Sequence, residues 1–219
     1  MNVELIDQMG SDLSVVNAAR VSFAKKSEME WVKREDSPTM YKQTLSDKDK
    51  KLIGYLAKHN HWSPFGHASL QFHIKAPIFV ARQLVKHQVG LVWNEVSRRY
   101  VDDEPEFYIP KEWRLKAEDK KQGSSEETIE YNIDGSIQFV KQTYDNLLKA
   151  GVAPEMARMI LPQNLYTEWY WSGTLMAFAR VCNLRCAKDT QWETQQIANQ
   201  IHYESRQLFP ISWKYLRVT

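Results

Sequence analysis

Apolar and polar residues alternate with a period of two in several short segments, and this pattern predicts β-strands. Residues 2–8 alternate in this way, and residues 68–74 place Ala, Leu, Phe and Ile on one face and Ser, Gln and His on the other. Residues 106–109, which end at Pro110, and residues 165–171 have the same strand character. The predicted strands are spread widely along the chain.

A helical period of about 3.6 residues predicts helices between and after these strands. Ser11 and Ser46 are typical N-caps, and Pro77 suits the first turn of a helix. Gly151 is placed to end the long amphipathic segment that precedes it. The predicted helices cover residues 12–21, about 47–56, 77–87, 137–148, 154–162, 173–184 and 190–207.

Two charged, aperiodic segments, residues 25–45 and 115–128, are predicted to be loops. The second contains Gly-Ser-Ser, which is typical of an exposed connection. Because the helices and strands do not alternate regularly, the pattern favours an α+β fold. A length of 219 residues fits a single domain that covers residues 1–219.

Charge and composition indicate which partners and which cellular compartment to expect. The formal net charge is only +2, so we expect no general attraction to nucleic acid or to an anionic membrane. No run approaches the roughly 20 apolar residues of a membrane-spanning helix, and the acidic start is unlike a secretion signal. Cys182 and Cys186 are expected to be reduced thiols packed in a helix, which favours a cytoplasmic protein.

Polar groups are concentrated in residues 82–100, in and after the helix predicted from Pro77. Gln83, Lys86 and His87 fall on one face of that helix, away from its apolar stripe. The stripe is predicted to comprise Ile78, Ala81, Leu84 and Val85. The guanidinium groups that follow suit a phosphate, because their planar fork donates two parallel hydrogen bonds. On composition alone, a helix followed by a solvated charged loop is the alternative interpretation.

The same segment resembles the signature of a known family. Lys86-His87-Gln88, followed by Asn-Glu-Val-Ser-Arg-Arg-Tyr at residues 94–100, is similar to the Arg-His-Arg and Ser pattern of flavin-dependent thymidylate synthases. Further similar segments occur in the family's order at residues 12–23, 59–67, 75–83, 157–167, 183–185 and 191–193. Together they cover nearly the whole chain.

The chain departs from the family pattern at a few positions. Lys86 and Gln88 replace the two arginines of the signature, and eight residues instead of seven separate Gln88 from Ser97. Gly66 stands where the family has glutamate, and Asp189 stands where histidine is usual. Several of these positions belong to the family's flavin-contacting set. A lysine keeps the charge of an arginine but not its bidentate geometry.

The resemblance implies methylation of C5 of dUMP to dTMP, with FAD as cofactor and NADPH and methylenetetrahydrofolate as co-substrates. Other thymidylate synthases attack C6 with a cysteine preceded by proline, and neither Cys182 nor Cys186 follows a proline. A route without an enzymic thiol is therefore expected, in which the flavin carries the hydride. The resemblance also implies an antiparallel sheet core flanked by long helices, and a homotetramer with sites shared between subunits.

The resemblance assigns roles to individual residues. Arg185 would polarise the pyrimidine and His61 would lie near the flavin–folate face, so these two are the candidate catalytic residues. Ser97 is assigned to nucleotide binding, because no sequence feature activates it as a nucleophile. The candidate dUMP ligands are Gln83, Glu95, Ser97, Arg98, Arg99, Arg158 and Arg185. The candidate FAD ligands are Ser63, Lys86, His87, Gln88, Asn94, Arg180 and Asp189.

Other interpretations stay open at this point. The histidines at positions 59, 61, 67 and 73 raise the question of a metal, but no cysteine or acidic ligand accompanies them closely, so we expect none. The departures at Lys86, Gln88 and Gly66 leave two alternatives to the synthase. One is a flavin or folate enzyme that hydroxymethylates a pyrimidine nucleotide, ending with water in place of hydride. The other is a nucleotide-binding regulator that has lost turnover.

Overall fold

Three of the four predicted strands pair into one antiparallel sheet. The computed structural model describes residues 1–34, 36–100, 103–118 and 123–217, and its central sheet has the strand order β1-β4-β8-β5. These strands are β1 (Asn2–Met9), β4 (Ser69–Pro77), β8 (Tyr166–Thr174) and β5 (Leu91–Glu95). The α+β class and the strands predicted at 2–8, 68–74 and 165–171 are confirmed, whereas β5 lies in the polar segment and is not among the predicted strands.

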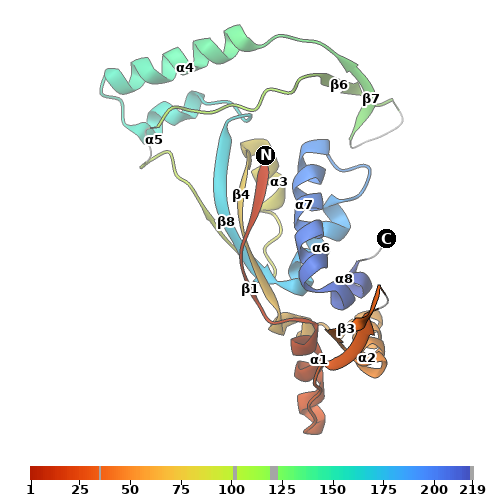
Figure 1. The fold of residues 1–219 in the computed structure, drawn as a ribbon. Helices are drawn as coiled ribbons and strands as arrows, with labels where there is room; N and C mark the ends of the chain where they lie inside the picture. Colours follow the sequence, from red (N-terminus) through yellow and green to blue (C-terminus); the bar gives the residue numbers. More distant parts are fainter. Residues whose placement is uncertain (35, 101–102, 119–122, 218–219) are drawn as a thin grey trace.

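Helices α6, α7 and α8 lie together on one side of the sheet (Figure 1). Their side chains meet β4 and β8 in the core, where Phe72 and Trp171 pack edge-on against Phe178 at centroid distances of 5.1 and 5.3 Å. Burial of one such side chain stabilises the fold by roughly 2–3 kcal/mol. The helices are α1 (Asp12–Arg20), α2 (Asp47–Lys58), α3 (Ile78–Leu84), α4 (Asp134–Lys149), α5 (Pro154–Ala157), α6 (Leu175–Arg185), α7 (Trp192–Leu208) and α8 (Pro210–Leu216), with 3-10 turns η1 (Val21–Phe23), η2 (Ser63–His67) and η3 (Arg158–Ile160).

Helix α3 is shorter than the predicted 77–87. Pro77 is the last residue of β4 and the N-cap of α3, and the helix ends at Leu84. The chain must then reverse into β5, which it does through a bond from His87 N to Leu84 O (3.0 Å) and through Gly90 at φ +76°. Of the predicted apolar stripe, Ala81 and Leu84 are buried, Ile78 and Val85 are half-buried, and Val80 is an additional buried member.

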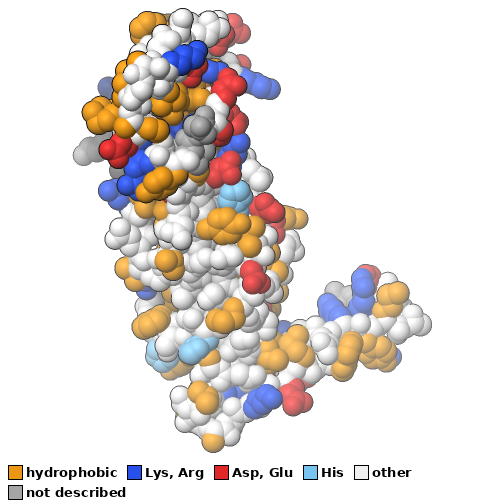
Figure 2. All heavy atoms as spheres, turned by 90° about the vertical axis from the view of Figure 1, so that its left-hand side faces the viewer, with side chains coloured by type: hydrophobic (Ala, Val, Ile, Leu, Met, Phe, Trp, Pro, Cys, Tyr) orange, Lys and Arg blue, Asp and Glu red, His pale blue; other side chains and the backbone are white. Residues whose placement is uncertain are grey.

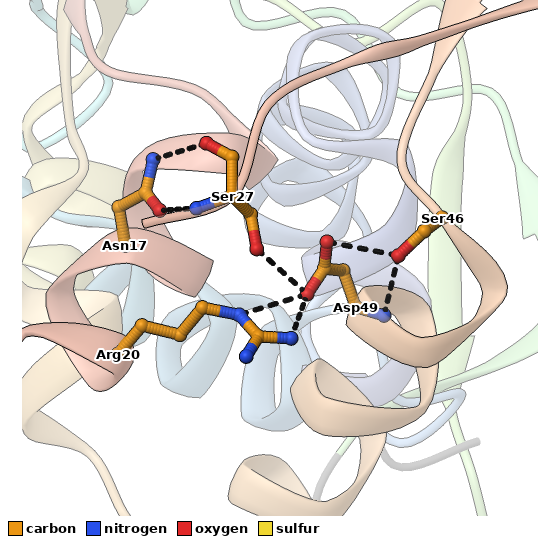
Figure 3. Close-up of polar contacts among 5 residues, drawn as sticks. All are labelled: Asn17, Arg20, Ser27, Ser46 and Asp49. Carbon is orange, nitrogen blue, oxygen red and sulfur yellow. Dashed lines mark hydrogen bonds and ion pairs between the residues drawn. The ribbon is translucent and has the colours of Figure 1, made fainter. Parts of the chain in front are cut away.

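A buried carboxylate ties α1, α2 and the segment between them together (Figure 3). Asp49 on α2 is 3% exposed. Its carboxylate accepts hydrogen bonds from Arg20 Nε (3.0 Å) and Ser27 Oγ (3.0 Å), and a further one from Ser46 Oγ (2.9 Å). Asn17 holds Ser27 in place by bonding its main-chain N–H and C=O. Burial raises the pKa of Asp49, but the hydrogen bonds from Arg20, Ser46 and Ser27 outweigh it and leave the pKa below its ordinary value.

The N-cap predicted at Ser46 is confirmed, since its hydroxyl accepts a bond from Asp49 N at 3.1 Å. The predicted ends of the α4 and α7 segments also agree with the structure to within a few residues.

Two hairpins occupy the segments predicted to be loops, so both loop predictions are wrong. In the segment 25–45, β2 (Glu30–Arg34) pairs with β3 (Ser37–Thr44). In and around the segment 115–128, β6 (Trp113–Lys116) pairs with β7 (Ser124–Ile129). Trp31 and Tyr41 in the first hairpin are 66% and 55% exposed. Because no buried face imposes an alternating pattern there, hydrophobic periodicity does not predict these strands. Figure 2 shows this hairpin as an arm that projects from the body and carries hydrophobic side chains.

The strand predicted at 106–109 is also wrong. Only an isolated bridge forms, between Phe107 and Leu165. Pro105 and Pro110 flank this segment, and a proline has no N–H to donate to a ladder.

Helix α4 and the β6–β7 hairpin form an arch over one end of the sheet (Figure 1). The arch is fastened to α7 by Glu193, which is 3% exposed and accepts bonds from Arg114 Nη2 (2.5 Å) and Tyr108 Oη (3.2 Å). Burial and the negative charge of Glu193 raise the pKa of Tyr108 to about 12. Tyr144 is the one buried residue of α4.

Helix α8 follows α7 and is not predicted from the sequence. Its first turn is held by Asp12 of α1, whose carboxylate accepts bonds from Ile211 N (2.9 Å) and Ser212 N (2.8 Å). Asp12 and this turn lie about 200 residues apart in the sequence, so a local sequence pattern does not predict the contact. Cys182 and Cys186 are both free thiols. No helix among the described residues is long and apolar enough to cross a membrane.

Candidate active site

The first group of candidate residues lies where α3 meets the end of α6. Arg185, the last residue of α6, donates from Nε to His87 Nε2 at 3.0 Å and from Nη2 to the main-chain oxygen of Gln83 at 3.4 Å. The predicted common face of Gln83 and His87 is therefore real, although the helix ends between them. Lys86, the third predicted member of that face, is exposed.

The side-chain amide of Gln83 is fixed by α7. Its Oε1 accepts a bond from Thr194 Oγ1 at 3.2 Å, and its Nε2 donates to Gln191 Oε1. Thr194 is fully buried. Gln191 and Thr194 are not among the site residues predicted from the sequence. The Gln-Trp-Glu segment of the family resemblance contains Gln191 but not Thr194, and it does not say which partner the glutamine contacts.

A second group lies where the chain leaves β5. Glu95 accepts bonds from Thr167 Oγ1 (2.7 Å) and Trp93 Nε1 (3.1 Å), so its two carboxylate oxygens are both engaged. Ser97 Oγ accepts a bond from Arg99 Nε at 3.2 Å, and the Arg99 guanidinium lies 5.1 Å from the Tyr100 ring centroid. Arg99 itself is exposed.

Arg98 and Arg158 line one small pocket, although they are 60 residues apart in the sequence. The pocket has a volume of about 100 Å³ and is also lined by Ile78 and Thr167. An adjoining pocket of about 280 Å³ shares Arg98 and Thr167 with it. Arg98 also donates to the main-chain oxygen of Asp103 at 2.7 Å. Since small-molecule sites usually occupy about 300–1,000 Å³, the smaller pocket suits a phosphate group better than a whole nucleotide.

Helix α3 sets the separation between the two groups. Ile78 at its start lines the pocket of Arg98 and Arg158, whereas Gln83 near its end contacts Arg185. Five residues of helix rise roughly 7–8 Å, a span comparable with the length of a nucleotide. Within the described residues no hydrogen bond or ion pair joins the two groups. The arrangement is suited to holding a phosphate at one end and a base at the other, within one chain or between neighbouring chains.

Two of the candidate flavin ligands, Lys86 and Gln88, adjoin His87 in the sequence. Lys86, Gln88, Asn94 and Arg180 are exposed, and their side chains form no hydrogen bond or ion pair with other described residues. Ser63, at the start of η2, and Asp189, between α6 and α7, are exposed as well. The register of β5 from Leu91 to Glu95 against β8 is unbroken, so the extra residue of the signature does not form a bulge in this strand. A ligand with several acceptor groups would find two cations and two amides free to bind it.

His61 lies in the turn that follows α2. The His59 and His61 ring centroids are 6.3 Å apart, and both rings are close to Tyr55. His61 is exposed and contacts neither group of candidate residues in the part of the chain that is described. No cluster of three or more His, Cys, Asp or Glu side chains suited to a metal occurs among the described residues.

A large cavity lies under the arch, next to Gln191. It has a volume of about 770 Å³ and is lined by residues of α3, α4, α7 and the β6–β7 hairpin, Phe79, Trp113 and Glu193 among them. None of the candidate dUMP or FAD ligands lines it. Gln191, which also contacts Gln83, is the point where this cavity meets the first group.

Known proteins resemble this chain over almost its whole length. A family model described as thymidylate synthase complementing protein matches residues 4–211. The flavin-dependent thymidylate synthase of Thermus thermophilus is 40% identical over 215 residues, which cover 96% of this chain and 73% of that protein. The one from Thermotoga neapolitana is 41% identical over 213 residues, covering 97% and 88%. The crystal structure of the UMP/dUMP methylase PolB from Streptomyces cacaoi, bound with 5-Br dUMP, has a TM-score of 0.77 and 29% identity, covering 98% and 93%.

Proposed function

Because the chain belongs to the family of flavin-dependent thymidylate synthases, we propose that it methylates C5 of dUMP to give dTMP, with FAD as the flavin and NADPH and methylenetetrahydrofolate as co-substrates. Membership makes the chain a methyltransferase that uses a flavin. The observation that carries the finer proposal is the pairing of Arg185 with Gln83 near one end of α3 and of Arg98 with Arg158 at its other end. The UMP/dUMP methylase PolB is bound with 5-Br dUMP, which supports dUMP as the substrate here.

The candidate flavin ligands fit a flavin dinucleotide by their chemistry. Lys86 and Arg180 offer positive charge to a diphosphate, and Gln88 and Asn94 offer amide donors and acceptors. None of these side chains is occupied by another described residue. Lys86 does not have the fork of an arginine, so we expect weaker orientation of the diphosphate than in relatives with Arg-His-Arg. When bound, the flavin supplies the hydride that reduces the one-carbon unit to a methyl group.

Arg185 is proposed to polarise the uracil ring. Transfer of a carbon unit to C5 requires negative charge to build up on the ring carbonyls, and a guanidinium that faces them stabilises this charge. Burial lowers the pKa of Arg185, yet among the described residues no carboxylate is paired with it to cancel its charge. Its neutral partners leave the full positive charge to act on the substrate.

The second group is proposed to hold the sugar and phosphate. Arg99 and Arg158 are the proposed phosphate ligands. Ser97 accepts a hydrogen bond from Arg99, and Arg98 lines the same small pocket as Arg158. Glu95 is already held by Thr167 and Trp93, which orients it without using up all its lone pairs. In the described part of the chain, the side-chain contacts of Ser97 are with Arg99 and not with a base, so Ser97 stays a binding residue.

The role of His61 at the flavin–folate face remains a proposal, as does a homotetramer with shared sites. His61 lies apart from both groups in one chain, so a shared site is the arrangement in which it reaches the flavin. Sedimentation equilibrium of the flavin-loaded protein tests the assembly. A monomer that converts dUMP at full rate contradicts shared sites.

Substitution of Arg185 separates chemistry from binding. We expect Arg185→Ala to lower kcat by at least about 100-fold, since it removes a charge that acts mainly in the transition state, and to change dUMP affinity much less. Release of tritium from 5-tritiated dUMP measures the turnover. Wild-type turnover in this variant rules out the assigned role.

The departures at Lys86, Gln88 and Gly66 favour one second candidate, a hydroxymethylase. It shares attack of C5 on the methylene donor and ends with water in place of hydride. Mass spectrometry of the nucleotide product separates the two, because only one carries an added oxygen. A protein that binds dUMP but releases no tritium would instead be a regulator.

A further inference from the structure

The contact between His87 and Arg185 has a consequence for how the guanidinium is held. Arg185 Nε donates to His87 Nε2 at 3.0 Å. An arginine has only donors, so the nitrogen that faces it must be a lone-pair acceptor. His87 is therefore neutral in this arrangement and carries its proton on Nδ1.

The surroundings of His87 keep it neutral. The ring is half-buried between α3 and α6, and burial and the charge of Arg185 both lower its pKa. Of the charged groups that the structure describes, Arg185 is the one that acts on this pKa, and no carboxylate opposes it. Protonation would place two cations face to face and leave Arg185 Nε without an acceptor.

The guanidinium is thereby fixed at two of its nitrogens. Nε is bound to His87 and Nη2 to the main-chain oxygen of Gln83, while Nη1 has no partner among the described residues. A flexible arginine held in this way has its open edge pointed in one direction, at little further cost in conformational entropy when a ligand binds. Both acceptors belong to the segment at the end of α3.

We propose that His87 is a positioning residue, which as a neutral acceptor holds Arg185 with its free edge toward the nucleotide. The inference deepens the proposed function and rests on it. It differs from the flavin contact expected for His87 from the sequence, because Nε2 is used for Arg185 and only Nδ1–H is left for another ligand. His87 thus joins the nucleotide side of the site to the flavin side.

The test uses flavin-loaded full-length protein and dUMP in equilibrium dialysis between about pH 5 and 8. Three proteins are compared: wild type, His87→Gln, which keeps a neutral acceptor at similar reach, and His87→Phe, which keeps a ring without an acceptor. Because the phosphate of dUMP also titrates near pH 6, only differences between the proteins count. The wild type should lose affinity on acidification relative to His87→Gln, because only the wild-type side chain becomes a cation.

At neutral pH His87→Phe should bind dUMP about tenfold more weakly, and its kcat should fall further than its affinity. His87→Gln should recover most of both, which a purely structural role of the ring would not produce. Equal pH dependence in wild type and His87→Gln, or wild-type affinity in His87→Phe, overturns the inference.

An NMR titration of His87 gives a readout that needs no nucleotide. Arg185→Gln should raise the pKa of His87, since a positive charge is removed, and should change the tautomer signal of Nε2. An unchanged pKa contradicts the inference even if the protein binds no dUMP. If the pKa shifts but no protein binds dUMP, the proposed function fails and the His87–Arg185 contact stands.

Discussion

Replacement of Asp49 by asparagine tests how the N-terminal helices are held together. The substitution keeps the size of the side chain and one acceptor oxygen, and it removes the negative charge that faces Arg20. The Arg20 and Asp49 side chains are only 16% and 4% exposed, so the guanidinium left behind recovers little hydration. Hydrogen bonds to charged groups contribute about 1.5–3 kcal/mol, and breaking a buried pair on one side costs about 3–5 kcal/mol. Since Arg20 keeps some contact with water, we expect a loss of about 2–3 kcal/mol.

Urea unfolding at one fixed protein concentration measures this loss. With a typical slope for urea, a change of this size moves the midpoint down by about 1 M. The matched control is Asp36→Asn, because Asp36 also pairs with an arginine, Arg34, at 2.6 Å but is exposed to solvent. Its midpoint should not move measurably. A loss below about 0.5 kcal/mol in Asp49→Asn, or an equal loss in both variants, refutes the reasoning.

The same pair predicts a pH dependence with a definite sign. The folded-state pKa of Asp49 lies below its ordinary value of 3.8, so the charged form is favoured by folding. The stability it contributes is fully present above that value and is lost as the pH falls through the folded pKa. The difference in free energy of unfolding between wild type and Asp49→Asn should therefore shrink below about pH 4. A difference that grows on acidification contradicts the assignment.

Three further predictions follow from the site and its surroundings. Arg99→Ala should weaken dUMP binding by about tenfold or more in equilibrium dialysis, because a charge-assisted phosphate contact is lost. Arg206→Ala, on the exposed side of α7, is the control and should leave dUMP affinity unchanged. Equal affinities of the two variants contradict the phosphate role. Cys186 should react with iodoacetamide faster than Cys182, with a rate that rises through about pH 7. The reason is that hydrogen bonding to Cys182 and the nearby Arg217 guanidinium lower the pKa of Cys186 to about 7. Peptide mass mapping that finds Cys182 labelled first is the opposing result. Glu193→Gln should loosen the arch, because the ion pair with Arg114 is lost. Limited proteolysis should then cleave the β6–β7 hairpin faster than in wild type. Unchanged cleavage shows that the arch does not depend on this contact.

The sequence predicts the elements that have one buried face. Strands β4 and β8 and helices α6 and α7 follow their hydrophobic period, because a wrong register there would expose core side chains such as Phe72 and Trp171. The two hairpins have no such face and are missed. Helix α8 depends on Asp12 almost 200 residues earlier, and no local pattern carries that information.

The candidate site is predictable in its residue types but not in its grouping. The family resemblance points to Arg158 and Arg185, and their chemistry is sufficient to expect an anionic nucleotide. It does not reveal that Arg158 belongs with Arg98, or that Arg185 is bound to His87. These contacts depend on where α3 leaves the sheet and where α6 ends. Gln191 contacts Gln83 only because α7 packs beside α3.

The mass of the nucleotide formed from dUMP tests the central claim most directly. The protein is incubated without oxygen with dUMP, methylenetetrahydrofolate, FAD and NADPH, and the product is analysed by mass spectrometry. The expected product is dTMP, with tritium released from C5 of 5-tritiated dUMP and no oxygen atom added to the nucleotide. A hydroxymethylated nucleotide, or dUMP recovered unchanged from a protein that binds it, would contradict the account.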